Sequence, residues 1–244
     1  MRTLIVSMAL LLAAVPASAQ DWNNLAASEA MNQVHATMRQ HMIVNPAEER
    51  GTPRPATPGP SAAIDPAYPV SRAVRREVEQ NLAAAVARKN KEAGRQLAAT
   101  FARHDLIAMA DRTLSSFGLR SGNVIDAVTI YRIAMWGAAK GLTTPPPRPS
   151  ITGARQQAAA RFDLAGAGLD TPARRQQFSE TLLYQAILMD MASEQAQKDG
   201  DHQTIAALRE AARQALRASG IDPDRTRLSA RGFVRSSQAQ APLM

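Results

Sequence analysis

The sequence NVIDAVTIYRIAMWGAAK, residues Asn123 to Lys140, has the pattern of a helix that is buried on nearly every side. Apolar residues recur at helical spacing on three faces, which carry Val124, Val128, Tyr131 and Met135, then Ile125 and Trp136, and finally Ile130, Ile133 and Gly137. A helix that faces water has a single apolar stripe, so apolar residues all round indicate a helix inside a bundle. Asn123 suits an N-cap and Gly141 a C-cap. We therefore predict a buried central helix here.

The residues around this stretch are helical in pattern as well. Predicted helix starts lie at Ser71, Asn90, Asp105, Ser150, Thr171 and Asp201, and glycine stop signals at Gly118, Gly141, Gly200 and Gly220. Hydrophobic residues make up 45% of the chain but aromatic residues only 4%, which favours close-packed helices over sheets. We predict an all-α fold, a single helical bundle of about six helices, in a domain of residues 71–234. Arg231 to Val234 is expected to be a short extended piece.

The first 70 residues differ from this domain. A positive start at Arg2, an apolar run from Leu4 to Val15 and the sequence Ala17-Ser18-Ala19 predict a signal peptide of residues 1–19. The apolar run is too short for a membrane-spanning helix, which needs roughly 20 residues. No later stretch is long and apolar enough to cross a membrane. We expect an exported protein, periplasmic or extracellular.

Two further segments are expected before the domain and one after it. Residues 20–44 carry apolar residues at spacings of three and four, which predicts a separate N-terminal amphipathic helix. Residues 45–70 contain seven prolines, a density that predicts a Pro-rich, disordered linker. Residues 235–244 are expected to form a disordered tail. The N-terminal helix is lined by methionines, which suit adaptable contacts. It could dock on its own bundle, on a second copy or on a different protein.

Composition excludes several classes of site. The chain has no cysteine, which rules out disulfides, cysteine zinc sites and a thiol nucleophile. It lacks the glycine patterns of phosphate loops and dinucleotide sites, and it lacks the G-x-S-x-G motif of serine hydrolases. We expect no cofactor.

Two carboxylates are the candidates for acid and base chemistry. Asp126 lies at the start of the central helix, and Glu180 lies four residues before Tyr184 on another predicted helix. If the bundle brought them together, they would form the pair of a polysaccharide hydrolase. The alternative is that Asp126 caps its own helix, in a near capping box with Asn123, and that Glu180 belongs to a buried polar cluster or a solvated face.

The remaining titratable residues give no firm metal site. Asp190 and Glu194 are four residues apart, a spacing that lets two carboxylates meet a hard cation. No histidine accompanies them at helical spacing. The four histidines, His35, His41, His104 and His202, fall in different segments and are interpreted as surface or capping residues. We predict no metal site.

The chain is basic, with 29 Lys and Arg against 21 Asp and Glu and a net charge of +8. Ten basic and five acidic residues lie between Arg72 and Arg120. Arg72, Arg75 and Arg76 are the candidate binding residues, for anionic lipid, lipopolysaccharide or an acidic partner at the envelope. Nucleic acid is not an expected partner, because this region has few aromatic residues, Phe101 among them, to stack a base. The alternative is a solvated, arginine-rich surface.

Three stretches together resemble an uncharacterised family of exported, helical bacterial proteins that is known as a domain of unknown function. They are Gly118-Leu119 followed by Asn123-Val124, Asp126-Ala127, Tyr131 and Trp136, then Arg175-Gln176 with Glu180, and last Leu228 to Gly232-Phe233-Val234. The resemblance covers about Val70 to Val234. The sequence departs from the family pattern at Ile125, where a small residue is usual. It implies an exported helical domain and brings no activity, ligand or catalytic residue.

Two hypotheses for the function follow. The first is an exported, non-enzymatic binding or interaction module at the bacterial envelope or outside the cell. The alternative is an envelope polysaccharide hydrolase that uses Asp126 and Glu180. A structure separates them, because a hydrolase needs its carboxylates to face each other across an open cleft.

Overall fold

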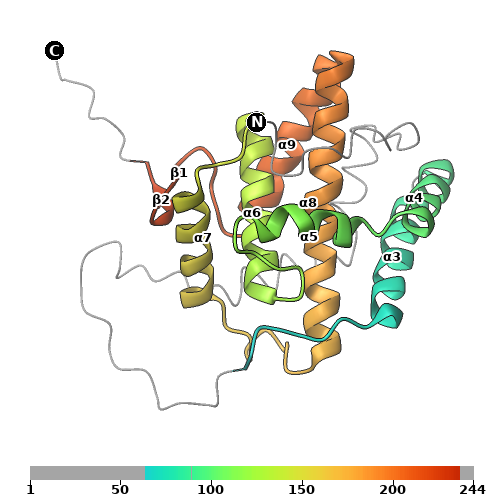
Figure 1. Cartoon of the computed structure of the whole chain (residues 1–244). Helices are drawn as coiled ribbons and strands as arrows, with labels where there is room; N and C mark the ends of the chain where they lie inside the picture. Colours follow the sequence, from blue (N-terminus) through green and yellow to red (C-terminus); the bar gives the residue numbers. More distant parts are fainter. Residues whose placement is uncertain (1–63, 89, 237–244) are drawn as a thin grey trace.

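The computed structural model describes residues 64–88 and 90–236, which form seven helices and one β-hairpin (Figure 1). The elements are α3 (Arg72–Ala87), α4 (Lys91–Arg103), α5 (Leu106–Ser115), α6 (Val124–Lys140), α7 (Arg148–Arg161), α8 (Pro172–Asp199), α9 (His202–Ala218), β1 (Thr226–Ser229) and β2 (Gly232–Arg235). The predicted helical fold is confirmed for the described residues. The predicted number of about six helices is corrected to seven.

Side-chain caps fix most of the helix starts, as the sequence predicts. Ser71, Asn90, Asp105, Thr171 and Asp201 each accept a hydrogen bond from a backbone N–H three residues later. Asn123 accepts from the N–H groups of both Ile125 and Asp126. The helix α7 differs, because it begins at Arg148 rather than Ser150 and has no side-chain cap. Pro149 lies in its first turn, where a missing N–H costs nothing.

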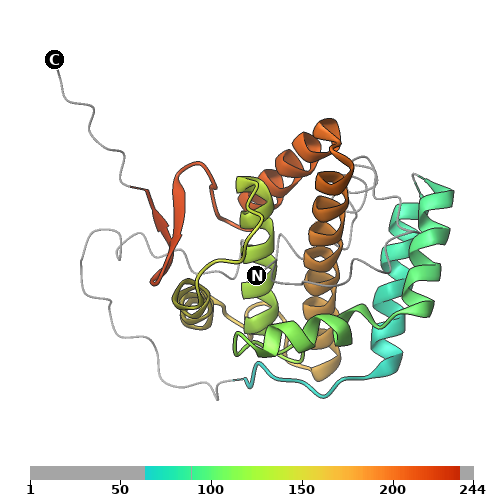
Figure 2. The ribbon, with the colours of Figure 1, turned by 45° about the horizontal axis from the view of Figure 1, so that its top comes forward.

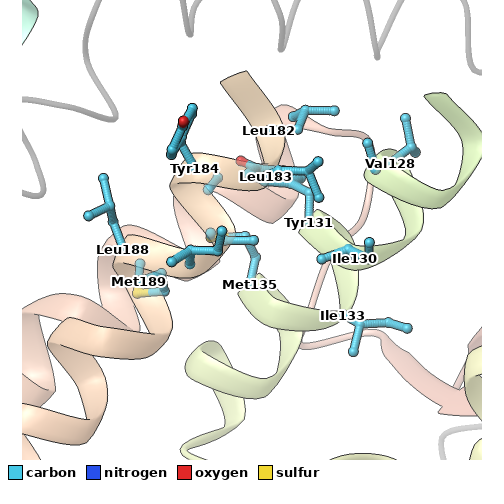
Figure 3. Packing of buried hydrophobic residues seen from close by; sticks show 14 of the residues in the cluster. Val128, Ile130, Tyr131, Ile133, Met135, Leu182, Leu183, Tyr184, Leu188 and Met189 are labelled. Carbon is cyan, nitrogen blue, oxygen red and sulfur yellow. The ribbon is translucent and has the colours of Figure 1, made fainter. Parts of the chain in front are cut away.

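The core is built around two helices, α6 and α8, which pack along each other. Figure 3 shows their apolar side chains meeting, with Tyr131 and Met135 of α6 beside Leu183 and Met189 of α8. The predicted burial of α6 on nearly all sides is confirmed. The helix α8 is also buried on all sides over its middle, from Phe178 to Met189.

The other elements cover this central pair. The helix α7 packs on α6, and α3 packs on α8 and on α4 (Figures 1 and 2). The helix α9 contacts both α6 and α8. Buried Arg132 of α6 donates a hydrogen bond of 2.6 Å to the carbonyl of Ser219 at the end of α9. Burial removes water from this guanidinium and lowers the pKa of Arg132 to about 10.

The antiparallel hairpin β1–β2 packs on α7. Gly153 of α7 allows this contact, because a Cβ there would overlap the carbonyl oxygen of Ala230 in the turn. Gln157 then bonds both backbone groups of Phe233, donating to its carbonyl at 2.8 Å and accepting from its N–H at 3.0 Å. The predicted extended piece is therefore strand β2, and its partner β1 was not predicted. Arg235 belongs to β2 rather than to a disordered tail.

Residues 64–70 belong to the folded domain, although the sequence assigns them to the linker. The Tyr68 side chain is only 7% exposed, and its hydroxyl donates to the carbonyl of Ser121 at 2.7 Å. Backbone hydrogen bonds join Tyr68 to Gly122 and Pro66 to Val124. The predicted signal peptide, the N-terminal helix and the rest of the linker, residues 1–63, lie outside the described residues, as do residues 237–244 of the tail.

Candidate functional site

A pocket of about 110 Å³ lies where α6, α8 and α9 meet the loop that connects α6 to α7. Its wall is mostly apolar, with Ile130, Ile133 and Met189 among the lining residues. Five polar or charged residues from α8 and α9 also line it, namely Asp190, Ser193, Glu194, Gln197 and Arg209. An apolar pocket with a few polar groups is the usual form of a small-molecule site.

Small residues on the last turns of α6 make room for the pocket. Ala134, Gly137 and Ala138 share one face of the helix and line the pocket. Gly137 is notable, because a Cβ there would meet no atom within 4 Å. A glycine inside a helix costs about 1 kcal/mol relative to alanine, and no crowding at Gly137 requires it. Its effect in this structure is to leave the pocket wall open.

The loop after α6 forms part of the pocket wall. Gly141 ends α6 in the left-handed conformation, with φ of 65°, as its glycine predicts. A Cβ on Gly141 would overlap the guanidinium of Arg209, so this arginine of α9 lies directly against the loop. Leu142 follows and is 43% exposed, although it is a large apolar residue that lines the pocket. The apolar lining of the pocket therefore reaches the protein surface at Leu142.

Asp190 is the carboxylate of the pocket that lacks a partner. Its carboxylate has no hydrogen bond or ion pair with any of the described residues, whereas Glu194 pairs with Lys198 at 2.8 Å. Burial, and to a smaller extent the charge of Glu194, raises the pKa of Asp190 to about 6. The sequence indicates this residue only as half of a possible metal site with Glu194.

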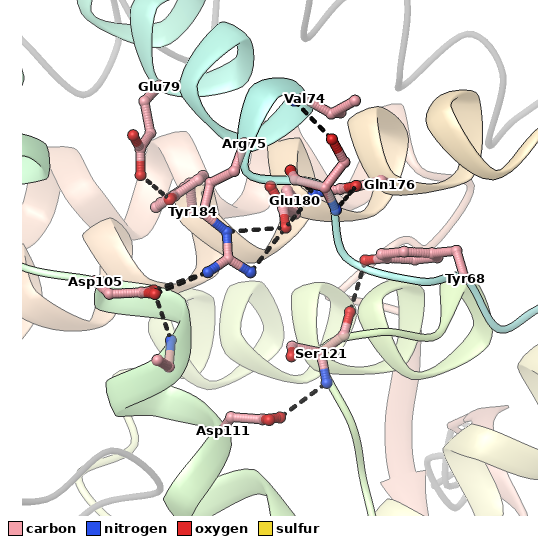
Figure 4. Close-up of polar contacts among 12 residues, drawn as sticks. Tyr68, Val74, Arg75, Glu79, Asp105, Asp111, Ser121, Gln176, Glu180 and Tyr184 are labelled. Atoms are coloured by element: carbon pink, nitrogen blue, oxygen red, sulfur yellow. Dashed lines mark hydrogen bonds and ion pairs between the residues drawn. The ribbon is translucent and has the colours of Figure 1, made fainter.

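Glu180 lies in a separate polar cluster that joins α3, α5 and α8 (Figure 4). Arg75 donates to Glu180 Oε1 from Nε at 3.1 Å and Nη2 at 2.9 Å, and to Asp105 from Nη1. Gln176 donates to the same Oε1 at 3.0 Å and also binds the backbone of Ser71. The Glu180 side chain is 1% exposed, and burial raises its pKa against the opposing effect of Arg75.

The three predicted binding arginines do not form one surface. The Arg75 side chain is only 16% exposed and is held by two carboxylates. Arg72 and Arg76 are exposed. Arg75 is therefore a structural residue of the cluster, and two of the three candidates remain available to a partner.

Asp126 lies outside this cluster and forms its hydrogen bonds with Arg155 and Arg120. Its Oδ1 accepts from Arg155 Nε of α7 at 2.5 Å and its Oδ2 from the N–H of Arg120 at 3.0 Å, so it makes no capping box with Asn123. Burial raises the pKa of Asp126, and Arg155 opposes that effect. Asp126 and Glu180 are each about 1% exposed and share no hydrogen-bond partner. The structure does not bring them together as an open acid and base pair.

No group of three or more His, Asp or Glu residues in the described ranges 64–88 and 90–236 is arranged to hold a metal ion. His104 is the C-cap of α4 and His202 is the first residue of α9, while His35 and His41 lie outside those ranges. Among the helices that the structure describes, none has both the length and the apolar character needed to span a bilayer.

Comparison with known proteins gives a family and no activity. A model described as "Family of unknown function (DUF6683)" matches residues 1–236. The match agrees with the resemblance to an uncharacterised family and extends it over the first 69 residues. No curated protein and no solved structure matches the chain.

Proposed function

The chain belongs to the DUF6683 family of unknown function, and from that premise we propose that it is an exported, non-enzymatic binding protein of the bacterial envelope or exterior. We place its ligand in the pocket between α6, α8 and α9. The observation that carries this proposal is the pocket itself, with its apolar wall, its single unpartnered carboxylate and the open space at Gly137. Export is supported by the signal-peptide pattern of residues 1–19.

The chemistry of the pocket supports binding rather than catalysis. Ser193 is the hydroxyl closest to Asp190 along α8, but it contacts the sulfur of Met189 at 3.7 Å rather than a base. Activation of a serine requires a base within hydrogen-bond reach. The carboxylates of the hydrolase hypothesis, Asp126 and Glu180, are buried and paired with arginines. The hydrolase hypothesis therefore has no support from their arrangement.

The arginines of α3 are a weaker location for the ligand. Arg75 lies between the two exposed arginines in sequence and is committed to Glu180 and Asp105. Two exposed arginines provide charge but no shaped surface, whereas the pocket provides both volume and a wall.

Titration with 1-hexanol tests the proposal, because this probe has an apolar chain and no charge. We expect saturable shifts of the methyl NMR signals of Ile133 and Leu142. Gly137→Leu, whose side chain enters the open space, is expected to weaken binding at least tenfold. Gly137→Ala is the matched control and should bind within about threefold of the wild type. Absence of saturable binding by the wild type, or equal binding by Gly137→Leu, would contradict the pocket as the site.

A further inference from the structure

We propose that the ligand of this pocket is a small aliphatic amine, whose ammonium group binds Asp190 and whose chain fills the apolar part of the cavity. This inference rests on the proposed function and adds the chemical class of the ligand. It depends on the position of one carboxylate, on the charges around it and on the size of the cavity.

The first observation is the isolation of Asp190. Most of its surroundings in the pocket are apolar, and no described residue donates a hydrogen bond to it. The Asp190 side chain is half-buried. A carboxylate that is largely withdrawn from water without a donor is costly, so such groups are normally paired with a cation or with hydrogen bonds. Asp126 and Glu180 follow that rule in this molecule, since each binds an arginine. Asp190 is left with its charge uncompensated.

The second observation is the set of charges that face Asp190. The lining residues of α6 and of the loop Gly141–Pro146 are all uncharged, as are the lining residues of α5 and α7. On α8, Glu194 is negative and already pairs with Lys198. On α9, Arg209 lies against Gly141 of the loop and makes no ion pair with Asp190. Arg209 lines the same pocket, but no cation of the described residues is paired with Asp190, and a bound ammonium would supply one.

The third observation is size. A cavity of about 110 Å³ is somewhat smaller than the engineered cavity of about 150 Å³ that binds benzene. It has room for a chain of about four to six carbons. An ammonium at one end of such a chain would reach the carboxylate while the carbons contact Ile130, Ile133 and Met189. A short primary amine matches both the charge and the volume.

The pairing predicts a pH window for binding. A primary amine has a pKa near that of lysine, about 10.4, so it is charged throughout the neutral range. The pKa of Asp190 is about 6 in the empty pocket. Both partners are charged between about pH 7 and pH 9, and amine binding should weaken as pH falls through 6 and Asp190 takes up a proton.

The test compares three probes of equal chain length, n-hexylamine, 1-hexanol and hexanoate, by calorimetry at pH 7.5. We expect hexylamine to bind at least tenfold tighter than hexanol, and hexanoate to bind more weakly than both. In Asp190→Asn the preference for the amine should fall below threefold while hexanol affinity is kept, which shows that the pocket is intact. Glu194→Gln is the matched control and should change amine affinity less than threefold. At pH 5 the wild type should lose most of its preference.

Each other result has a distinct meaning. Equal affinity for hexylamine and hexanol overturns the assignment of an amine and leaves the proposed binding function standing. Tightest binding of hexanoate overturns it as well and moves recognition to Arg209. Binding of none of the probes overturns both this inference and the pocket as a binding site.

Discussion

Asp190 makes the stability of the protein depend on pH. Its pKa is about 6 in the folded state, against about 3.9 for an unfolded aspartate. Because the folded pKa is the higher one, this group favours folding fully below pH 4, and the contribution is lost as pH rises through 6. Asp190→Asn removes the charge that burial penalises. We expect the variant to exceed the wild type by about 1–3 kcal/mol in free energy of unfolding at pH 8.

Urea unfolding at two pH values checks this expectation. At pH 4 the aspartate is largely protonated in the folded state, so the advantage of the variant should shrink to near zero. A stabilisation that stays the same at both values would show that the effect comes from packing rather than from charge.

Truncation of the Arg75 side chain is predicted to lower the free energy of unfolding more than truncation of most residues near the surface. Its removal would leave the Glu180 carboxylate buried without a cation, and breaking such a pair typically costs about 3–5 kcal/mol. Arg75→Ala should therefore lower the free energy of unfolding by an amount of that order. Arg76→Ala, one residue further along α3 and exposed, should change it by no more than about 0.5 kcal/mol. Equal losses in thermal denaturation would show that the cluster contributes little.

At the residue scale, the sequence identified carboxylates but not their partners. Glu180 is 105 positions from Arg75 in the chain, and Asp126 is 29 positions from Arg155. Such pairings depend on how helices pack, and helix periodicity does not determine packing partners. For the same reason an arginine of the predicted basic face became an internal ion-pair partner.

Two helix glycines show that the same substitution has opposite effects in different elements. A methyl group at Gly137 of α6 meets open space, so Gly137→Ala should stabilise the protein by about 0.5–1 kcal/mol through helix propensity. A methyl group at Gly153 of α7 would overlap the carbonyl of Ala230, so Gly153→Ala should destabilise it by about 1–3 kcal/mol. The denaturant midpoints of the two variants show whether each substitution stabilises or destabilises the protein. A stabilising Gly153→Ala would mean that the hairpin can shift away from α7 at little cost.

At the element scale, helix starts and stops were largely predictable because caps are local. Asn123, Thr171, Gly141 and Gly200 act within one turn of their own helix ends. Strand β1 was not predictable, because its residues Thr226–Ser229 lack the alternation of apolar and polar residues that marks a half-buried strand. It is held by pairing with β2 and by contact with α7, and both are tertiary effects. The full burial of the middle of α8 is a tertiary effect as well, because Gln176 and Glu180 bond to Ser71 and Arg75 at the start of α3.

The boundary of the domain gives a prediction for the whole molecule. A chain that begins at Ser71 lacks buried Tyr68 and the hydrogen bonds of residues 66–68 with residues 121–124. We expect it to be less stable than a chain that begins at Ile64 by about 2–4 kcal/mol, from lost apolar burial and hydrogen bonds. Urea unfolding of the two chains decides this. Equal stability would place Tyr68 outside the cooperative unit.

At this scale the fold class was predictable and the pocket was not. The all-round apolar pattern of α6 indicates a helical bundle wherever the other helices lie. The pocket combines α6, α8, α9 and a loop, and its volume depends on their relative placement. Gly137 was the one local signal of the pocket, because a glycine inside a strongly helical stretch lowers helix stability and so calls for another reason. The sequence pattern indicates only that Gly137 belongs to an apolar face of the helix.

The enclosure of α6 and α8 by all the other helices has a consequence for how the molecule opens. Amide protons in the buried middle of these two helices, such as that of Tyr131, should exchange with solvent deuterium only when the whole domain unfolds, because no smaller opening is expected to expose them. Amides of α4 and of the hairpin, which each pack against fewer neighbours, should exchange earlier through partial openings. The slowest-exchanging amides would then trace the two central helices and report the global stability directly.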